Sequence, residues 1–218
     1  MKNRIRSARP RLLASLAGLL VWSAVTVGYM SVVGGEAGIS ALAETVRISP
    51  VYRVNGKSLV GGPFKLTNHR GERVTHEDFR GKHMLAYFGY THCPDICPHE
   101  LQVITEALDR LGDKAAEVQP VFITVDPERD TVEHMAKYVS HFHPKLIGLT
   151  GTEEEILVAA KAYRVLFRKA YDPSSSDYLM DHSSVTFLMD EEGEYAAHFV
   201  LGTTVDEMVE TLTKQLGK

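Results

Sequence analysis

The chain has 218 residues, 44% of them hydrophobic, and its formal net charge is −4 at pH 7. A chain of this length and composition can build one domain of ordinary size with a substantial hydrophobic core. The slightly negative charge argues against a nucleic-acid partner, because proteins that bind the phosphate backbone carry an excess of basic residues.

The first 33 residues predict a membrane anchor. The basic residues of this region all precede residue 12: Lys2, Arg4, Arg6, Arg9 and Arg11. Residues 12–33 carry no charge, and this run of 22 residues exceeds the roughly 20 that a helix needs to cross a bilayer. Because basic residues mark the cytoplasmic side, the N-terminus is expected in the cytoplasm and the rest of the chain across the membrane.

A cleaved signal peptide is the alternative to an anchor. Ala41-Leu42-Ala43 has the small residues of a cleavage site, but it lies well beyond the apolar run. Signal peptides also have a shorter apolar region of about 7–15 residues. Only eleven residues precede the span, which leaves little room for a mitochondrial transit peptide. The expected location is the bacterial inner membrane, crossed once, with the C-terminal domain in the oxidising periplasm.

Four segments are expected along the chain. Residues 1–11 form a cytoplasmic basic N-terminus, residues 12–33 the transmembrane anchor, and residues 34–60 a linker. The linker is inferred from its glycines and from Pro50. Residues 61–218 form the folded domain.

Apolar runs and helical spacing predict a regular series of elements in this domain. In chain order these are a hairpin of 64–66 with 73–74, a strand at 84–88, a helix at 101–111, a strand at 121–125, a helix at 132–142, a strand at 146–149, a helix at 156–166, a hairpin of 185–188 with 195–199 and a helix at 205–212. Capping-box pairs mark three helix starts: Asp130 with Glu133, Thr152 with Glu155, and Thr204 with Glu207. The order βαβαβα followed by ββα predicts an α/β, thioredoxin-like fold with an extra N-terminal β-hairpin.

The segment between Phe167 and Ser183 interrupts this series. Its roughly seventeen residues show no periodicity, and loops of that length in a compact domain are usually functional or disordered. The segment ends in Met180-Asp181-His182-Ser183, directly before a predicted core strand. A side chain at that position could reach across the fold.

The only two cysteines of the chain lie in Cys93-Pro94-Asp95-Ile96-Cys97-Pro98, directly after a predicted strand. Residues before proline avoid the helical conformation, so both cysteines are expected to be non-helical, with Cys97 as the N-cap and Pro98 as the first helical residue. A thiol at a helix N-terminus has a lowered pKa. Glu100 could bond to a cap amide and adds negative charge nearby.

Two thiols on one turn can form a disulfide if their Cα atoms lie within about 7 Å, or they can bind a metal ion. Thiolates favour Cu(I) and Zn(II), and two thiolates need at least one further donor. Among the ten histidines, His182 stands out by its place in the long loop, with Asp181 as a neighbour that could orient its ring. A loop histidine with an ordinary hydrogen bond is the alternative for His182, while His92 and His99 are expected to face solvent.

These features together resemble the Sco/SenC family of membrane-tethered, thioredoxin-fold copper proteins. The matching segments are Tyr87-Phe88-Gly89-Tyr90-Thr91-His92-Cys93-Pro94-Asp95-Ile96-Cys97-Pro98, Val125-Asp126-Pro127-Glu128-Arg129-Asp130-Thr131, Gly148-Leu149-Thr150-Gly151-Thr152 and Asp181-His182-Ser183. They occur in the family's order, and the resemblance covers about residues 60–218 together with the single N-terminal span.

The resemblance implies a copper site and a function. The family's ligands fall on Cys93, Cys97 and His182, which would hold one Cu(I) or Cu(II) ion per chain; this mixed sulfur and nitrogen set suits both oxidation states. The implied role is a metallochaperone that delivers copper to, or prepares the thiols of, the dinuclear copper site (CuA) of cytochrome c oxidase during assembly. The implied partners are the copper-site subunit of the oxidase, a copper donor protein and a thiol reductant.

Three other functions compete with this one. A membrane-tethered thiol–disulfide oxidoreductase acting on the cysteines of the oxidase copper site would need only Cys93 and Cys97, so whether the protein is an enzyme stays open. A peroxiredoxin-like peroxidase is disfavoured, because that family has threonine three residues before its reactive cysteine, whereas Thr91 lies two before Cys93. A purely structural disulfide is also disfavoured, since closing so short a loop gains little stability.

Overall fold

The structure is a computed structural model that describes residues 53–54, 57–171 and 177–217. The predicted basic N-terminus, the transmembrane anchor and most of the linker lie outside the described residues. Within the described part of the chain, no helix is both long and apolar enough to cross a membrane.

A seven-stranded mixed sheet forms the centre of the domain, in the order β11-β10-β5-β6-β7-β3-β4. Its middle is parallel and is made of β5 (His83–Gly89), β6 (Val118–Thr124) and β7 (Ile147–Thr150). Antiparallel pairs flank it: β10 (Val185–Met189) with β11 (Tyr195–Val200) on one side, and β3 (Lys65–Asn68) with β4 (Arg73–Thr75) on the other. Two short strands, β1 (Arg53–Val54) and β2 (Lys57–Ser58), pair separately.

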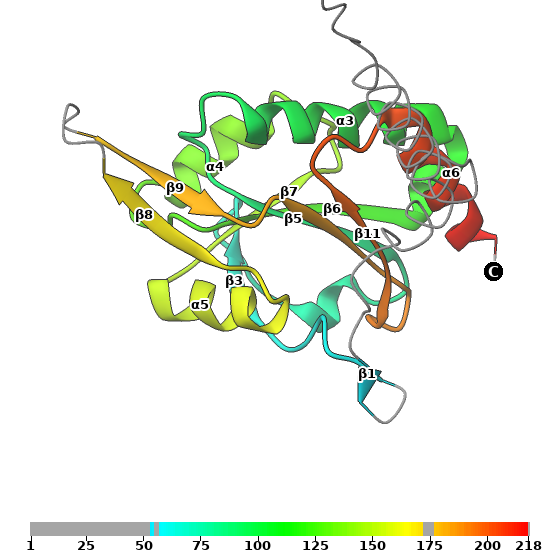
Figure 1. The fold of residues 1–218 in the computed structure, drawn as a ribbon, viewed down its shortest axis with the longest axis horizontal. Coiled ribbons are helices and arrows are strands. Elements are labelled where there is room, and N and C mark those ends of the chain that lie inside the picture. Colours follow the sequence, from blue (N-terminus) through cyan, green and yellow to red (C-terminus); the bar gives the residue numbers. More distant parts are fainter. Residues whose placement is uncertain (1–52, 55–56, 172–176, 218) are drawn as a thin grey trace, which may run out of the picture. The chain divides into compact units, whose positions relative to one another are not determined.

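In the described part of the chain, four α-helices cover the two faces of the sheet. Figure 1 shows α3 (Ile96–Leu111), α4 (Val132–Val139) and α6 (Val205–Leu216) on one face and α5 (Glu153–Ala162) on the other. Right-handed crossovers explain why α3 and α4 share a face, because they connect the parallel strands β5 to β6 and β6 to β7 in the same direction across the sheet. Two 3₁₀ helices, His76–Phe79 and Gly112–Glu117, precede β5 and β6.

Burial on both faces explains why the central strands are almost uniformly apolar. Every residue of β5 is buried, and Leu85, Ala86, Tyr87 and Phe88 have no exposed surface. Parallel strands covered by helices on both sides lose the usual alternation of apolar and polar residues. The uncharged run at 84–88 was therefore a reliable signal for a core strand.

The predicted mixed α/β, thioredoxin-like fold is confirmed, and apart from a strand pair at 167–182 its elements follow the predicted order. Capping boxes are present at Thr152 with Glu155 and at Thr204 with Glu207. The predicted cap at Asp130 is wrong: Thr131 is the N-cap of α4 and accepts a hydrogen bond from the amide of His134. Asp130 is instead fully buried and bonds to the cysteine turn, so its side chain is committed elsewhere.

The prediction of an irregular loop at 167–183 is also wrong. β8 (Phe167–Tyr171) and β9 (Tyr178–His182) pair antiparallel in a separate two-stranded sheet, with His182 opposite Phe167. Of the described side chains of this ribbon only Met180 is buried, and its exposed positions hold both charged residues and the apolar Tyr171 and Leu179. A strand pair with so little buried surface shows no apolar alternation in its sequence.

Candidate metal centre

The cysteine turn connects the end of β5 to the start of α3. Asp95 is the N-cap and the helix begins at Ile96, so Cys97 lies inside the first turn and not at the cap. The prediction of a non-helical Cys97 is therefore wrong. Pro98 does not prevent the earlier start, because amides of the first helical turn have no intrahelical partner for proline to remove.

The two cysteines are not disulfide-bonded, and they differ in protonation. Hydrogen bonds from the Cys97 thiol and from the backbone amides of Cys97, Asp95 and Ile96 lower the pKa of Cys93 to about 5. The amide of Cys97 lies 3.3 Å from the Cys93 sulfur. The partly buried Cys93 is therefore a thiolate at neutral pH.

Cys97 has the opposite environment. It is fully buried, and both its hydrogen bond to Cys93 and its burial raise the pKa of its thiol. The prediction of a lowered pKa at Cys97 is thus wrong, and the lowered pKa belongs to Cys93. Burial disfavours the charged form of the Cys97 sulfur. The Cys97 thiol also donates a hydrogen bond to the Cys93 thiolate, so it keeps its proton.

Gly89 makes the close packing around Cys97 possible. A Cβ atom at residue 89 would lie 2.9 Å from the Cys97 sulfur and 2.8 Å from a ring carbon of Phe122. Both distances are shorter than real Cβ contacts, so any side chain here would displace the sulfur or the ring. The last residue of β5 therefore sets the position of the buried thiol.

The fold brings His182 to the same thiol across 85 residues of sequence, with Nε2 3.6 Å from the Cys97 sulfur. Its Nδ1 lies 3.2 Å from the carbonyl oxygen of Ser183. Because a carbonyl only accepts, Nδ1 carries the proton and the lone pair of Nε2 faces the sulfur. Burial lowers the pKa of His182, which keeps the ring neutral and able to bind a metal.

The predicted orienting role of Asp181 is not what the structure shows. Side chains alternate along a strand, so Asp181 and His182 point to opposite faces of β9. The Asp181 carboxylate is exposed and accepts hydrogen bonds from Arg168 at 2.9 and 3.1 Å. The backbone carbonyl of Ser183 orients the histidine instead. Glu100 does not cap the helix either, since it is buried and bonds to the backbone of Gly202.

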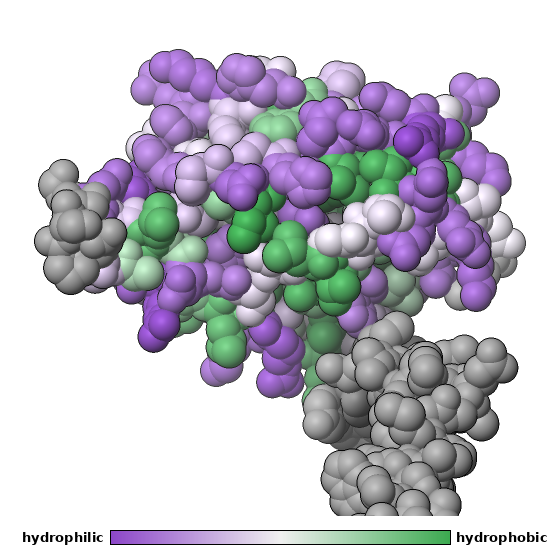
Figure 2. Space-filling model, turned by 45° about the horizontal axis from the view of Figure 1, so that its top comes forward, coloured by the Kyte–Doolittle hydropathy of each residue, from purple (hydrophilic) through white to green (hydrophobic). Residues whose placement is uncertain are grey.

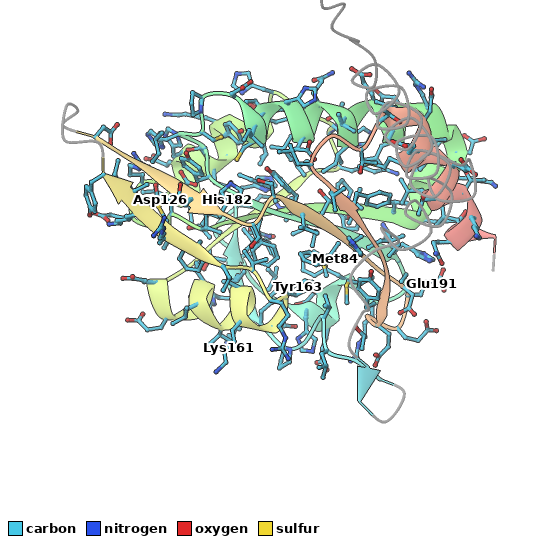
Figure 3. All side chains as sticks on the ribbon, viewed as in Figure 1. Met84, Asp126, Lys161, Tyr163, His182 and Glu191 are labelled. Atoms are coloured by element: carbon cyan, nitrogen blue, oxygen red, sulfur yellow. The ribbon has the colours of Figure 1, made fainter. Side chains whose placement is uncertain are left out.

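A cluster around Arg129 holds the β8–β9 hairpin against the loop after β6. The guanidinium lies 3.8 Å from the ring centroid of Tyr178 and donates to the Tyr178 carbonyl at 3.0 Å. It also pairs with the buried carboxylate of Asp126 at 2.5 Å, and the Tyr178 hydroxyl donates to that carboxylate at 2.8 Å. Figure 3 shows Asp126 and His182 at the same end of the sheet.

These three residues form a clasp that positions the strand carrying His182. Asp126 and Arg129 lie in one of the segments that carried the family resemblance, but no role followed from the sequence. Tyr178 had no sequence signal, because it lies in the segment without periodicity. Only the packing of the hairpin against the loop shows what these residues do.

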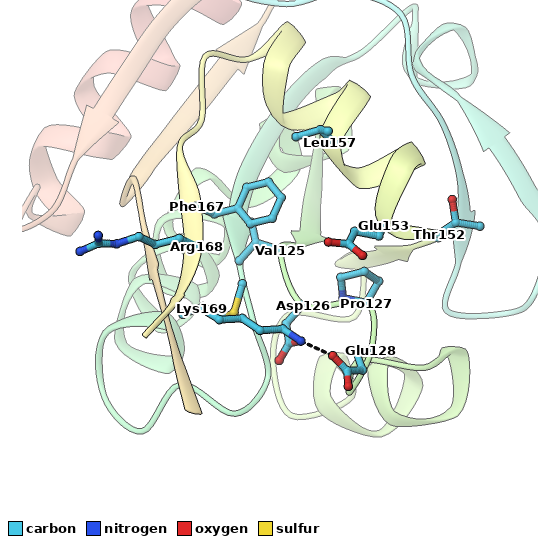
Figure 4. Close-up of a pocket in the computed structure, with 12 residues that line it drawn as sticks. Val125, Asp126, Pro127, Glu128, Thr152, Glu153, Leu157, Phe167, Arg168 and Lys169 are labelled. Atoms are coloured by element: carbon cyan, nitrogen blue, oxygen red, sulfur yellow. Dashed lines mark hydrogen bonds and ion pairs between the residues drawn. The ribbon is translucent and has the colours of Figure 1, made fainter. Parts of the chain in front are cut away.

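Hollows adjoin the hairpin on several sides. A pocket of about 580 Å³ lies between α5 and β8, where Lys169 pairs with Glu128 (Figure 4). A second one, of about 380 Å³, is lined by Leu166, Phe167, Arg168, Asp181, His182 and Ser183. The second hollow gives His182 an open side, so a partner molecule can approach the ring from solvent.

The site combines two sulfur donors and one imidazole nitrogen. Soft sulfur ligands favour Cu(I), while imidazole also suits Cu(II) and Zn(II). The three donor atoms are not all within 4.8 Å of one another in the described chain, so an ion bound to all three would draw them together. Cys93 has the freedom for this movement, since it is partly exposed.

Comparison with known proteins gives a consistent result. The SCO1/SenC family model matches residues 53–217. Protein SCO1 homolog 1, mitochondrial, of Arabidopsis thaliana is 46% identical over 162 residues, which cover 74% of this chain and 48% of that protein. Protein SCO1 homolog, mitochondrial, of Homo sapiens is 46% identical over 146 residues, which cover 66% of this chain and 48% of that protein. The chain spans about half the length of these relatives.

Solved structures agree in fold. The crystal structure of Arabidopsis thaliana ScoI with copper bound is 46% identical, with a TM-score of 0.69, and the match covers 72% of this chain and 98% of that one. Bradyrhizobium japonicum ScoI with copper bound is 43% identical, with a TM-score of 0.66 and coverage of 72% and 99%. Because the matched region includes the cysteine turn, the clasp and β9, and extends over most of the sequence, this protein belongs to the SCO1/SenC family.

Proposed function

We propose that this protein is a copper metallochaperone that binds one copper ion through Cys93, Cys97 and His182. The observation that carries the proposal is the position of His182 Nε2, 3.6 Å from the buried Cys97 sulfur and 85 residues away in sequence. A pair of thiols that only exchanged electrons would not need an imidazole with its lone pair aimed at the sulfur.

Copper as the metal is supported by chemistry and by the relatives. Two sulfurs favour Cu(I), and the imidazole keeps the ion bound after oxidation to Cu(II). The Arabidopsis and Bradyrhizobium relatives were each solved with copper bound. The thiolate of Cys93 can bind the ion without first losing a proton, because its pKa is about 5.

The proposed acceptor is the CuA site in the copper-site subunit of cytochrome c oxidase, as the family resemblance implies; a copper donor protein and a thiol reductant are further proposed partners. A partner can approach through the open side of His182 and the exposed edge of Cys93. Exposed apolar residues, among them Ile96 at the start of α3 and Leu201 before α6, offer surface for contact with a protein. Figure 2 shows such apolar surface set among hydrophilic side chains.

Copper retention by His182→Ala tests the proposal. The reduced full-length protein should bind one Cu(I) per chain, and His182→Ala should bind Cu(II) at least about tenfold more weakly while its fold is unchanged. Oxidase assembly in cells carrying His182→Ala should fall. Wild-type copper affinity together with wild-type oxidase activity in this variant would refute the metallochaperone function.

A thiol–disulfide oxidoreductase is the second function that a specific observation favours. A partly exposed thiolate beside a buried, protonated thiol is the arrangement of an attacking and a resolving cysteine. Cys97→Ser should then trap a mixed disulfide between Cys93 and the acceptor's thiols, detectable on a non-reducing gel. Trapping with normal function of His182→Ala would favour the reductase, whereas failure of trapping with impaired His182→Ala would favour copper delivery.

We also propose that residues 12–33 anchor the protein in the bacterial inner membrane with the thioredoxin-like domain in the periplasm. The uncharged run of 22 residues behind five basic residues supports this arrangement. Full-length protein should stay with membranes after an alkaline wash, and a protease added to spheroplasts should digest its C-terminal domain. Release of the protein by the wash would argue for cleavage instead, at the site expected after Ala43.

A further inference from the structure

We propose that His92, Asp130 and His134 form a second metal site, which binds a divalent first-row transition ion without any thiol. The site lies beside the cysteine turn and shares no ligand with Cys93, Cys97 and His182. It is independent of copper delivery, since its donors and its chemistry differ from those of the thiol site.

Three elements meet at this position. His92 lies in the cysteine turn, Asp130 in the loop after β6, and His134 in the first turn of α4. One donor atom from each residue lies within 4.8 Å of the other two, a condition that no other group of three histidine, cysteine, aspartate or glutamate residues meets in the described chain. The imidazoles of His92 and His134 are stacked, with ring centroids 4.9 Å apart and planes at 14°.

Asp130 supplies a buried charge without a basic partner. Its carboxylate is fully buried and accepts hydrogen bonds from the Thr91 amide and from the hydroxyls of Thr91 and Thr124. Its ion-pair contact in the described chain is with His92, whose Nδ1 lies 3.6 Å from Oδ1. Buried carboxylates are normally paired with a cationic side chain or bound to a metal ion. The Asp130 carboxylate instead has neutral hydrogen-bond donors and one histidine as its partners. A cation bound by Asp130 and the two histidines would balance the buried negative charge of the carboxylate.

The donor set selects the class of ion. Two imidazole nitrogens and one carboxylate oxygen suit Zn(II) and Cu(II), at about 2.0–2.2 Å from each ligand. Ligand atoms at these distances around one ion are roughly 3.3 Å apart. The stacked rings must therefore turn, so that their in-plane nitrogen lone pairs converge on one point. Both histidines are exposed, and no packed core has to shift for their side chains to turn. Water can fill the remaining positions on the exposed side.

Other charges near the site act in opposite directions. The N-terminus of α4 presents the positive end of the helix dipole to an ion held by His134, which weakens binding of a cation. The negative carboxylate of Asp130 offsets this effect at short range. Arg129 is adjacent in sequence, but its guanidinium is already paired with Asp126 and with Asp177. The nearest arginine is therefore not a free positive charge in the site.

The consequence is a pair of neighbouring sites with different preferences. Because His92 directly precedes Cys93, an ion bound at the histidines lies at the edge of the thiol site. The sulfur ligands favour Cu(I), whereas a set of two histidines and a carboxylate favours divalent ions. The protein can thus hold a divalent ion next to the thiols while the thiol site remains free.

The test uses the full-length protein in detergent with Cys93→Ser, Cys97→Ser and His182→Ala combined, which removes the thiol site. Zn(II) and Cu(II) salts are the probes. We expect one ion per chain by calorimetry, and a Cu(II) electron paramagnetic resonance spectrum with coupling to two imidazole nitrogens. Adding His134→Ala should weaken binding at least tenfold and remove one nitrogen coupling. Adding His141→Ala should change nothing, because this exposed histidine lies just beyond the other end of α4.

Loss of all divalent binding in the triple variant, or equal binding with and without His134, would overturn the proposal. If the triple variant does not fold, as judged by circular dichroism, wild-type protein saturated with one Cu(I) replaces it, and Zn(II) should bind as a second ion that His134→Ala abolishes. Cu(I) affinity should be the same in wild type and His134→Ala. A fall in Cu(I) affinity in His134→Ala would contradict the independence of the two sites.

Discussion

The two cysteines lie four residues apart, yet the fold gives them opposite properties. Cys93 is partly exposed, and its pKa of about 5 makes it a thiolate at neutral pH. Cys97 is fully buried, keeps its proton and faces His182. For the proposed copper site, this difference predicts different tasks for the two sulfurs: Cys93 would meet incoming molecules, whereas Cys97 would be a fixed donor, packed against the core.

Removing either cysteine sulfur should weaken Cu(I) binding more than any other change considered below. Cys97→Ser is expected to raise the dissociation constant for Cu(I) by more than about 100-fold, because loss of a group that merely orients a ligand already costs 10–100-fold. Competition with a chromophoric Cu(I) chelator measures the change. Cys93→Ser should produce a comparable loss. Wild-type Cu(I) affinity in Cys93→Ser would mean that Cys93 is not a copper ligand. Cys97 would then be a ligand, and Cys93 would serve only in thiol–disulfide exchange.

Breaking the clasp should release the donor that faces Cys97. Arg129→Ala leaves the buried carboxylate of Asp126 without its cationic partner, which typically costs about 3–5 kcal/mol of stability. Urea unfolding measures the loss. The matched control is Arg168→Ala, whose ion pair with Asp181 is exposed and should be worth less than about 1 kcal/mol. Equal losses in the two variants would show that the clasp does not hold the hairpin.

Filling the space beside the buried sulfur should affect Cys97 and spare Cys93. Gly89→Ala places a Cβ atom against the Cys97 sulfur and Phe122, and overpacking of this kind costs about 1–3 kcal/mol. Thermal unfolding measures the loss of stability, and the Cu(I) affinity should fall with it. The rate at which iodoacetamide modifies Cys93 should stay near its wild-type value. A variant as stable as wild type would show that the sulfur has room to move.

The pKa of Cys93 should appear in the pH dependence of stability. Above pH 5 the folded protein holds a thiolate, while the unfolded chain keeps its proton up to an ordinary value of about 8.5. The unfolded state therefore binds more protons in this window, and the stability that Cys93 contributes rises with pH between about 5 and 8.5 and is lost as pH falls through 5. Cys97, whose pKa is raised in the folded protein, stays protonated in both states over most of this range and offsets the Cys93 contribution only near its upper end, where the unfolded thiol begins to ionise.

Urea unfolding of wild type and Cys93→Ser between about pH 5 and 8.5 isolates the contribution of the Cys93 thiolate to stability. The difference in unfolding free energy between the two proteins should grow as the pH rises. The modification rate of Cys93 by iodoacetamide should likewise have its midpoint near pH 5. A midpoint near 8.5 would mean that the turn does not stabilise the thiolate of Cys93.

The smallest effect is expected at Asp181. Asp181→Asn should leave copper affinity within about threefold of wild type, because its carboxylate pairs with Arg168 on the opposite face of β9 from His182. Titration with Cu(II) measures this, with His182→Ala as the comparison. A loss similar to that of His182→Ala would restore the orienting role first predicted for Asp181.

Local signals allowed much of the fold to be predicted from the sequence. The apolar run at 84–88 and the capping pairs at Thr152 and Thr204 depend on neighbours a few residues away, and these elements appear where they were expected. The β8–β9 hairpin escaped prediction because it buries little surface. The start of α3 escaped because proline is tolerated throughout the first helical turn.

The properties of the candidate site also fall into those that the sequence predicts and those that depend on the tertiary structure. The sequence by itself determined which donors the protein carries, since the spacing of Cys93 and Cys97 and the motif around His182 are properties of the chain. Only the tertiary structure decided that Cys93 is the thiolate, that Cys97 meets His182, and that Ser183 rather than Asp181 orients the ring. The reason is physical: protonation depends on burial and on hydrogen bonds, and here these come from residues that are distant in sequence.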